Sequence, residues 1–115
     1  MANTFKQISK AGVTSSDVIY TVAGSTTTVV LGLIIGNTQS SSITVTLTIN
    51  TDTAARSGAN NEANQAVELL TATSITANSS LELLAGNKIL LETTDVINLT
   101  ASAAADISIS VMEIT

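Results

Sequence analysis

The sequence predicts an all-β fold: a single antiparallel β-sandwich, jelly-roll-like, with about eight strands. Residues 43–50 read Ile-Thr-Val-Thr-Leu-Thr-Ile-Asn, so apolar and short polar side chains alternate and would point to opposite faces of a strand. Segments rich in Val, Ile and Thr recur along the chain between short Gly, Asn, Ser and Asp turns, a spacing typical of antiparallel sandwiches. Because 115 residues suffice for one core, we expect residues 1–115 to form one domain.

The first half of the chain is predicted to contain three clear strands. Residues 18–22 form a short strand, and residues 26–37 form a longer one. The middle of the longer strand is apolar at consecutive positions, which predicts a central strand buried on both faces. Gly32 within it indicates a β-bulge or a close backbone approach. The turn at residues 37–41 would join this strand to residues 43–50 as a hairpin.

The second half changes character before it returns to strands. Residues 53–64 have the composition of a loop, rich in Asn, Ser and Gly. Residues 62–70 allow a helical reading, because Ala63, Val67 and Leu70 would share one helical face. The Thr-rich stretch that follows is poor helix material, so we favour a loop and then a strand. Four further strands are predicted at residues 81–84, 88–92, 96–101 and 107–114.

The last predicted strand shows a change of phase. The apolar phase of residues 107–111 continues to Glu113, whereas Met112 and Ile114 fall in the polar phase. A bulge near Val111 would explain the change, and so would a strand that leaves the sandwich to contact another subunit.

Composition excludes several classes of function. The chain has a net charge of −5 and contains neither His nor Cys, which excludes serine triads, thiol chemistry and most zinc sites. Its acidic residues are scattered over predicted turns and strand edges, which argues against a catalytic carboxylate pair and a metal site. We therefore expect no enzymatic activity and no cofactor. The four basic residues are dispersed, whereas nucleic-acid grooves cluster them, so no nucleic-acid partner is expected.

The apolar segments are short. The longest, residues 29–35 with Gly32 inside it, is about a third of the length that a spanning helix needs. The N-terminus has no apolar run of the kind that signal peptides contain. We expect a product made in the cytoplasm, without a membrane partner.

The first ten residues combine apolar and basic side chains. Phe5 and Ile8 share this stretch with Lys6 and Lys10, which are two of the chain's four cations. One interpretation is a first strand whose Phe5 caps one end of the core. The other is an N-terminal arm, residues 1–10, that docks onto a neighbouring protein. We predict a protein interface at these positions and at the end of the last strand: Phe5, Lys6, Ile8, Lys10, Met112 and Ile114.

Several runs of sequence carry a resemblance to a known family. They read Asn-Ser-Ser-Leu at 78–81, Gly-Asn-Lys-Ile-Leu-Leu-Glu at 86–92 and Asp-Val-Ile at 95–97. Together with the opening at residues 18–22 and the Ala- and Ser-rich ending after residue 100, they resemble small virion proteins of tailed bacteriophages. The resemblance covers most of the chain, and residues 56–64 depart from it.

The resemblance implies a structural protein of the phage virion, most specifically a capsid decoration (cement) protein. Its partners would be the major capsid protein or other virion proteins. Thr- and Ser-rich faces suit this role, because short uncharged side chains can be covered without burying unpaired charge. We expect a homo-oligomer, with a trimer as one arrangement. The alternative is a neck, tail, baseplate or fibre-associated component with a receptor- or glycan-binding role, although Tyr20 alone offers little surface for stacking on a sugar.

Overall fold

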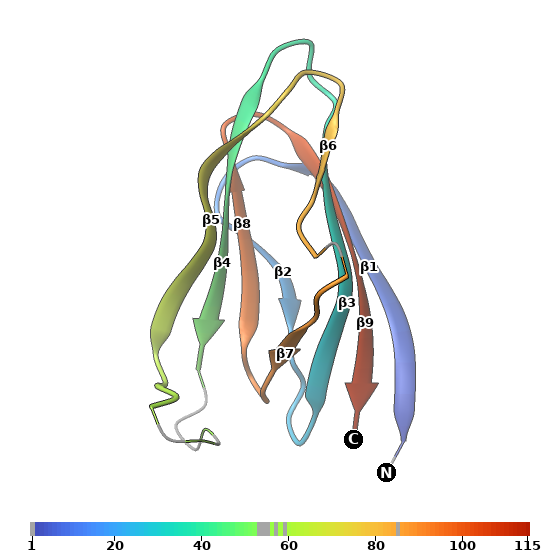
Figure 1. Cartoon of the computed structure of the whole chain (residues 1–115), viewed down its shortest axis with the longest axis vertical. Coiled ribbons are helices and arrows are strands. Elements are labelled where there is room, and N and C mark those ends of the chain that lie inside the picture. The colour runs from blue at the N-terminus through green and yellow to red at the C-terminus, as the bar shows by residue number, and fades with distance from the viewer. Residues whose placement is uncertain (1, 53–55, 57, 59, 85) are drawn as a thin grey trace.

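The computed structural model describes residues 2–52, 56, 58, 60–84 and 86–115, and it places them in two β-sheets packed face to face (Figure 1). The predicted all-β fold is confirmed, and no helix occurs among the described residues. In chain order the strands are β1 (Asn3–Val13), β2 (Asp17–Thr21), β3 (Thr27–Asn37), β4 (Ile43–Thr51), β5 (Gln65–Ile75), β6 (Ser80–Glu82), β7 (Ile89–Leu91), β8 (Val96–Ala101) and β9 (Ala105–Ile114).

The strand order is that of a jelly roll. Sheet A has the order β1-β9-β3, and both β6 and β7 pair with the far side of β3. Sheet B has the order β2-β8-β4-β5. Because β6 pairs with residues 34–36 of β3 and β7 with residues 28–30, these two short strands are pieces of one interrupted edge strand. If β6 and β7 are counted as one strand and the strands are renumbered from 1 to 8 along the chain, the two sheets have the orders 1-8-3-6 and 2-7-4-5. These orders are the jelly-roll arrangement.

The predicted hairpin between residues 26–37 and residues 43–50 is wrong. β3 lies in sheet A and β4 lies in sheet B, so the two strands face each other across the core. An alternating pattern fixes which face of a strand is buried, but it does not fix which strand lies beside it. The chain crosses between the sheets after Asn37, whose buried amide donates to the carbonyl oxygens of Ser41 and Ile75, both at 3.0 Å.

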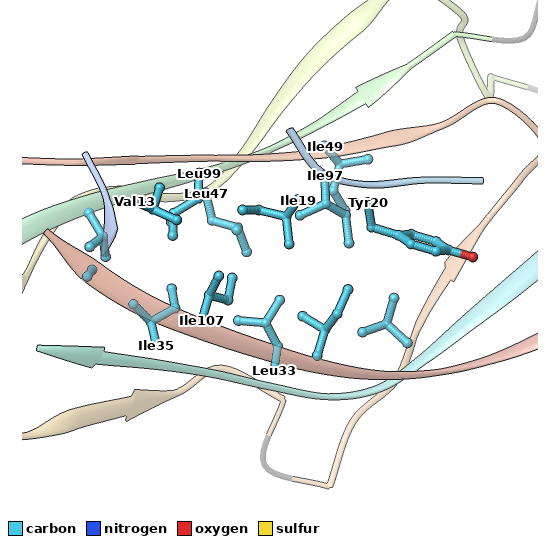
Figure 2. Close-up of a cluster of buried hydrophobic side chains, with 14 of the residues drawn as sticks. Val13, Ile19, Tyr20, Leu33, Ile35, Leu47, Ile49, Ile97, Leu99 and Ile107 are labelled. Atoms are coloured by element: carbon cyan, nitrogen blue, oxygen red, sulfur yellow. The ribbon is translucent and has the colours of Figure 1, made fainter. Parts of the chain in front are cut away.

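The core between the sheets is aliphatic, and Figure 2 shows many of its side chains. Leu33 and Ile35 point inward from sheet A, and Leu47 and Leu99 point inward from sheet B. All four are exposed by no more than 1%. Tyr20 is the one aromatic residue of this core, and it lies at one end of the cluster with its hydroxyl directed outward (Figure 2). Burial of these side chains is the main driving force for joining the two sheets.

Residues 65–75 form strand β5, which pairs with β4. The strand that we favoured in this region is confirmed, and the helical reading of residues 62–70 is wrong. The predicted loop at residues 53–64 lies partly outside the described residues.

The register between β3 and β9 shifts between Val30 and Gly32, which confirms the predicted bulge at Gly32. β3 is a central strand, as predicted, but the prediction that both of its faces are buried is wrong. Ile34 is 44% exposed, because the described residues leave the outer face of sheet A uncovered.

Strand β9 keeps its phase to its end. It pairs with β1 without interruption from Ile107 to Ile114, so residue 113 points inward like residue 111. A bulge does lie opposite Val111, but it belongs to β3, and the strand does not leave the sandwich. Glu113 therefore faces the interior edge of the sandwich, where it has polar partners.

Candidate interaction surface

Strand β1 is the outermost strand of sheet A and is paired on one side only. Its register with β9 is unbroken over eight residues, from Asn3 opposite Ile114 to Lys10 opposite Ile107. Even-numbered side chains of β1 point inward, since their partners on β9 belong to the buried face, and odd-numbered ones point outward. The N-terminal segment is thus a strand of the sheet. Phe5 does not cap the core, because it points outward and is 71% exposed.

Two ion pairs hold the inner face of β1. Lys6 Nζ lies 2.9 Å from Glu113 Oε1, and Lys10 Nζ lies 2.8 Å from Asp17 Oδ1. Both lysine side chains are about half exposed, so each pair stabilises the fold by at most about 1 kcal/mol. Charged side chains that point inward also discourage indiscriminate pairing of an edge strand with other sheets.

Glu113 is also joined to the interior through Tyr20. The Tyr20 hydroxyl donates to Glu113 Oε2 and accepts a hydrogen bond from the Thr28 hydroxyl at 2.8 Å. Burial raises the pKa of Tyr20 to about 12, and the hydrogen bond to Glu113 adds to the rise. Hydrogen bonds from Tyr20 and Lys6 hold the pKa of Glu113 below its usual value. These contacts connect β2 of sheet B to three strands of sheet A and so fix the edge strand to the body of the protein.

An uncharged apolar row crosses the outer face of sheet A. Phe5 on β1 is paired with Met112 on β9. Met112 is paired in turn with Val29 on β3, and Val29 with Leu90 on β7. Directly paired residues carry their side chains on the same face, and Leu90 at the far end is 64% exposed. We call these four residues the outer row; its ends, Phe5 and Leu90, are exposed, whereas Met112 and Val29 between them are partly buried. Apolar side chains grouped in this way on a surface mark interaction sites.

A shallow hollow of about 460 Å³ opens elsewhere on the outer face of sheet A. Small residues line much of it, among them Ser9, Gly36 and Ser108, and Ile34 contributes an apolar side chain. Ser9 is paired with Ser108, and Ser108 with Ile34, so these side chains form a second row parallel to the outer row. An aromatic ring fits in this volume, because a cavity of about 150 Å³ already binds benzene.

The structure divides the six predicted interface residues between two faces. Three lie on the outer face of sheet A: Phe5, Met112 and Ile114. Three lie on the inner face of β1: Lys6, Ile8 and Lys10. Sequence reasoning missed Val29 and Leu90, which complete the outer row. Their signal was apolar residues in both phases of their strands. For the strand at residues 26–37, which contains Val29, we interpreted this pattern as burial on both faces.

Sequence reasoning also missed a buried ion pair between Arg56 and Asp95. Arg56 donates to both carboxylate oxygens of Asp95, and the two side chains are 7% and 1% exposed. Asp95 accepts two more hydrogen bonds, from the backbone N–H groups of Glu92 and Asp52. With these four bonds the carboxylate is held by the protein itself, so the pair joins two loops and offers no open ligand position.

The described residues contain no group of three or more His, Cys, Asp or Glu side chains that could hold a metal ion. Within the same part of the chain, every buried side-chain nitrogen and oxygen has a hydrogen-bond partner. No helix there is long and apolar enough to cross a membrane. Sheet A carries an open strand edge, an apolar row and a hollow on its outer face.

No protein-family model and no curated protein matches this chain. A chain from Bacillus endospore appendages, described as disulfide-linked pili, is similar in structure with a TM-score of 0.48 and 14% identity, over 99% of this chain and 87% of that one. A chain of infectious bursal disease virus, Gx strain, is similar with a TM-score of 0.49 and 11% identity. The match covers 98% of this chain and 33% of the viral one. Similarities at this level identify no family and carry no argument about function.

Proposed function

We propose that this chain is a non-enzymatic structural protein of a tailed-phage virion, where it acts as a capsid decoration protein. In this role many copies bind the major capsid protein of the assembled shell and stabilise it. Many weak contacts placed side by side on a shell add up to firm attachment. The resemblance of the sequence to small virion proteins supports the proposal.

The observation that carries the proposal is the outer row beside the open edge of β1. Phe5, Met112, Val29 and Leu90 form an uncharged apolar strip that runs across four strands. A partner can cover such a strip without burying an unpaired charge, which would be costly. The backbone at these positions is already ordered in the sheet, so covering them costs only the freedom of the side chains.

The glycan-binding alternative gains no support from the positions of the aromatic residues. Tyr20 is 8% exposed and lies in the core, so its ring is not available to stack on a sugar. Phe5, the only other aromatic residue of the chain, is 71% exposed, but a single ring offers little surface for stacking on a sugar.

A protein inventory of purified phage particles by quantitative mass spectrometry tests the location. We expect a copy number of the same order as that of the major capsid protein. Detection at far lower copy number would favour the neck, tail, baseplate or fibre alternative, and absence from the particle would overturn the proposal.

Binding to shells that lack this protein tests the surface. Leu90→Ser should weaken binding by about tenfold, which corresponds to about 1.4 kcal/mol. Val18→Ser is the matched control, because Val18 is a 52% exposed apolar residue on the other sheet. Equal binding by the two variants would exclude the outer row as the contact surface.

A further inference from the structure

The free edge of β1 presents hydrogen-bonding groups from uncharged residues only. Ala2 and Thr115 exchange two backbone hydrogen bonds, N to O at 3.3 Å and 3.0 Å. In an antiparallel pair such hydrogen-bonded positions alternate with positions whose N–H and C=O groups point away. The even-numbered residues of β1 therefore bond to β9. The odd-numbered ones point their backbone groups to the free edge: Asn3, Phe5, Gln7 and Ser9.

The other long edge strand is built differently. β5 is as long as β1, but its register with β4 shifts twice, on either side of Leu47. Ala72 within it has a φ of 44°, a conformation that interrupts a regular strand. Bulges of this kind protect an edge against pairing with another strand. β1 has no such interruption between Asn3 and Lys10, so it is the edge that can accept a strand.

We propose that β1 pairs with β1 of a second copy of this chain, antiparallel and around a two-fold axis at Gln7. Gln7 then lies opposite Gln7 of the second copy, and Phe5 lies opposite Ser9. All of these positions have their backbone groups on the free edge, so the pairing satisfies them without changing the β1–β9 ladder. The Gln7 amide is tied to Ser9 and Ser108 of its own chain, at 3.1 and 3.2 Å, which keeps it flat against the sheet.

Charge favours a second copy at this edge. The chain carries a net charge of −5, but the only charged residues of β1, Lys6 and Lys10, are neutralised by Glu113 and Asp17 of the same chain. Two copies that meet here keep most of their negative charges apart, which other approaches would bring together. In the proposed register Lys6 lies opposite Ile8 and Lys10 opposite Thr4, so no like charges are directly opposed.

The same register brings Phe5 of each copy to the hollow of the other. Ser9, which would lie opposite Phe5, lines that hollow with Ser108 and Ile34. The small serine side chains leave room for a ring that reaches one strand spacing, about 4.8 Å, across the interface between the two β1 strands. The outer row of one copy would thus continue into the second row of its partner. The 71% exposed Phe5 would be covered in both copies at once.

The contact involves little more than one strand from each copy, which is small for a stable dimer. We therefore expect a reversible dimer with a dissociation constant on the order of micromolar to tens of micromolar. The inference concerns the purified protein by itself and does not depend on the proposed phage role. Leu90, whose substitution tests binding to the shell, lies on the opposite side of sheet A from the β1 edge.

Disulfide trapping tests the register directly, because the chain contains no cysteine. In Gln7→Cys the two introduced thiols would lie on paired residues whose Cα atoms are about 5.5 Å apart, within reach of a disulfide. Asn3→Cys is the matched control, since it is exposed on the same strand but not opposite itself. We expect Gln7→Cys to form covalent dimers at least about tenfold faster than Asn3→Cys. Equal rates would overturn the two-fold register.

Sedimentation equilibrium tests the pairing without a cross-link. Gln7→Pro removes an N–H on the free edge but none that bonds to β9, whereas Gln7→Ala keeps the N–H. We expect wild type and Gln7→Ala to dimerise alike, Gln7→Pro to lose the dimer with a similar Tm, and Phe5→Ala to weaken it by about tenfold. A wild-type protein that stays monomeric, or that forms trimers or longer chains instead, would overturn the proposal. If Gln7→Pro fails to fold, the disulfide experiment still decides.

Discussion

Arg56 binds the carboxylate of Asp95 through two parallel hydrogen bonds, from Nη1 to Oδ1 at 2.6 Å and from Nη2 to Oδ2 at 3.0 Å. The pair joins the segment after β4 to the turn between β7 and β8. Two buried charges are tolerated here because the hydrogen-bonding capacity of the carboxylate is used: it also accepts hydrogen bonds from two backbone N–H groups. Removing Asp95 leaves the buried Arg56 charge with the more distant Glu92 carboxylate, at 3.7 Å, and the Asn61 amide oxygen as partners. Such a loss is far more costly than losing an exposed pair.

Asp95→Ala should therefore lower the free energy of unfolding by about 3–5 kcal/mol. Asp17→Ala is the control, because Asp17 pairs with Lys10 at the exposed surface and should cost at most about 1 kcal/mol. Urea denaturation followed by circular dichroism measures both. Equal losses in the two variants would show that the buried pair contributes no more than a surface pair.

Stability should fall in acid. Burial alone would raise the pKa of Asp95, but the hydrogen bonds from Arg56 and from the backbone of Glu92 and Asp52 lower it below its usual value. The pKa of Glu113 is lowered too. A carboxyl group with a depressed folded pKa stabilises the fold fully above its unfolded pKa, about 4, and loses this contribution as the pH falls through the folded value. Denaturation curves between about pH 7 and pH 2 should show a smaller acid loss for Asp95→Asn than for wild type. An equal loss would contradict the assignment to Asp95.

The Tyr20 hydroxyl should lose its proton only at high pH. Its folded pKa of about 12 lies above the unfolded value of about 10. Its contribution is therefore complete below about pH 10 and is lost as the pH rises toward 12. Because Tyr20 is the only tyrosine, the phenolate absorbance of the folded protein reports this group directly. A midpoint near the ordinary value in the folded protein would show that the hydroxyl is open to solvent.

Tyr20→Phe should cost about 1–3 kcal/mol, because it leaves Glu113 and Thr28 without their shared partner. Thermal and urea denaturation at neutral pH measure the loss. Val18→Ala, on the same strand but 52% exposed, should change stability by about 0.5 kcal/mol or less. A similar effect of the two substitutions would argue that the hydroxyl does not connect the sheets.

Leu33→Ala should destabilise the fold by about 2–5 kcal/mol, since Leu33 is 1% exposed and its removal leaves a cavity between the sheets. Leu90→Ala removes the same atoms from a 64% exposed position and should cost about 0.5 kcal/mol or less. The midpoint of urea unfolding distinguishes the two. A large loss for Leu90→Ala would mean that the outer row supports the fold rather than a partner.

Much of the fold could be predicted from local pattern. The alternation at residues 43–50 predicted a strand and its buried face, and Gly32 marked the bulge in β3. The antiparallel sandwich followed from strand spacing and aliphatic composition, and the strand order of the structure confirms the jelly-roll topology that we expected. The hairpin between residues 26–37 and 43–50 was wrong, because a short connection permits either a turn within one sheet or a crossing to the other.

The candidate surface was predicted only in part. Phe5 and Met112 were named from the sequence, but their pairing across β1 and β9 depends on contacts between opposite ends of the chain. Val29 and Leu90 were missed, because an apolar residue in the outward phase has the same signature whether its face is covered or open. The Arg56–Asp95 pair had no local signal, since its partners are far apart in the sequence.

The sequence by itself determined that this chain forms strands, which face the alternating strands bury, and that the chain is rich in hydroxyl groups and poor in charge. These properties are local, because each residue's conformation and polarity act through its near neighbours. Only the tertiary structure decided which strands lie side by side, which edge stays regular and open, and which exposed side chains line up across sheet A. Those choices depend on burying all inward faces at once, a condition that no short segment of the chain can express.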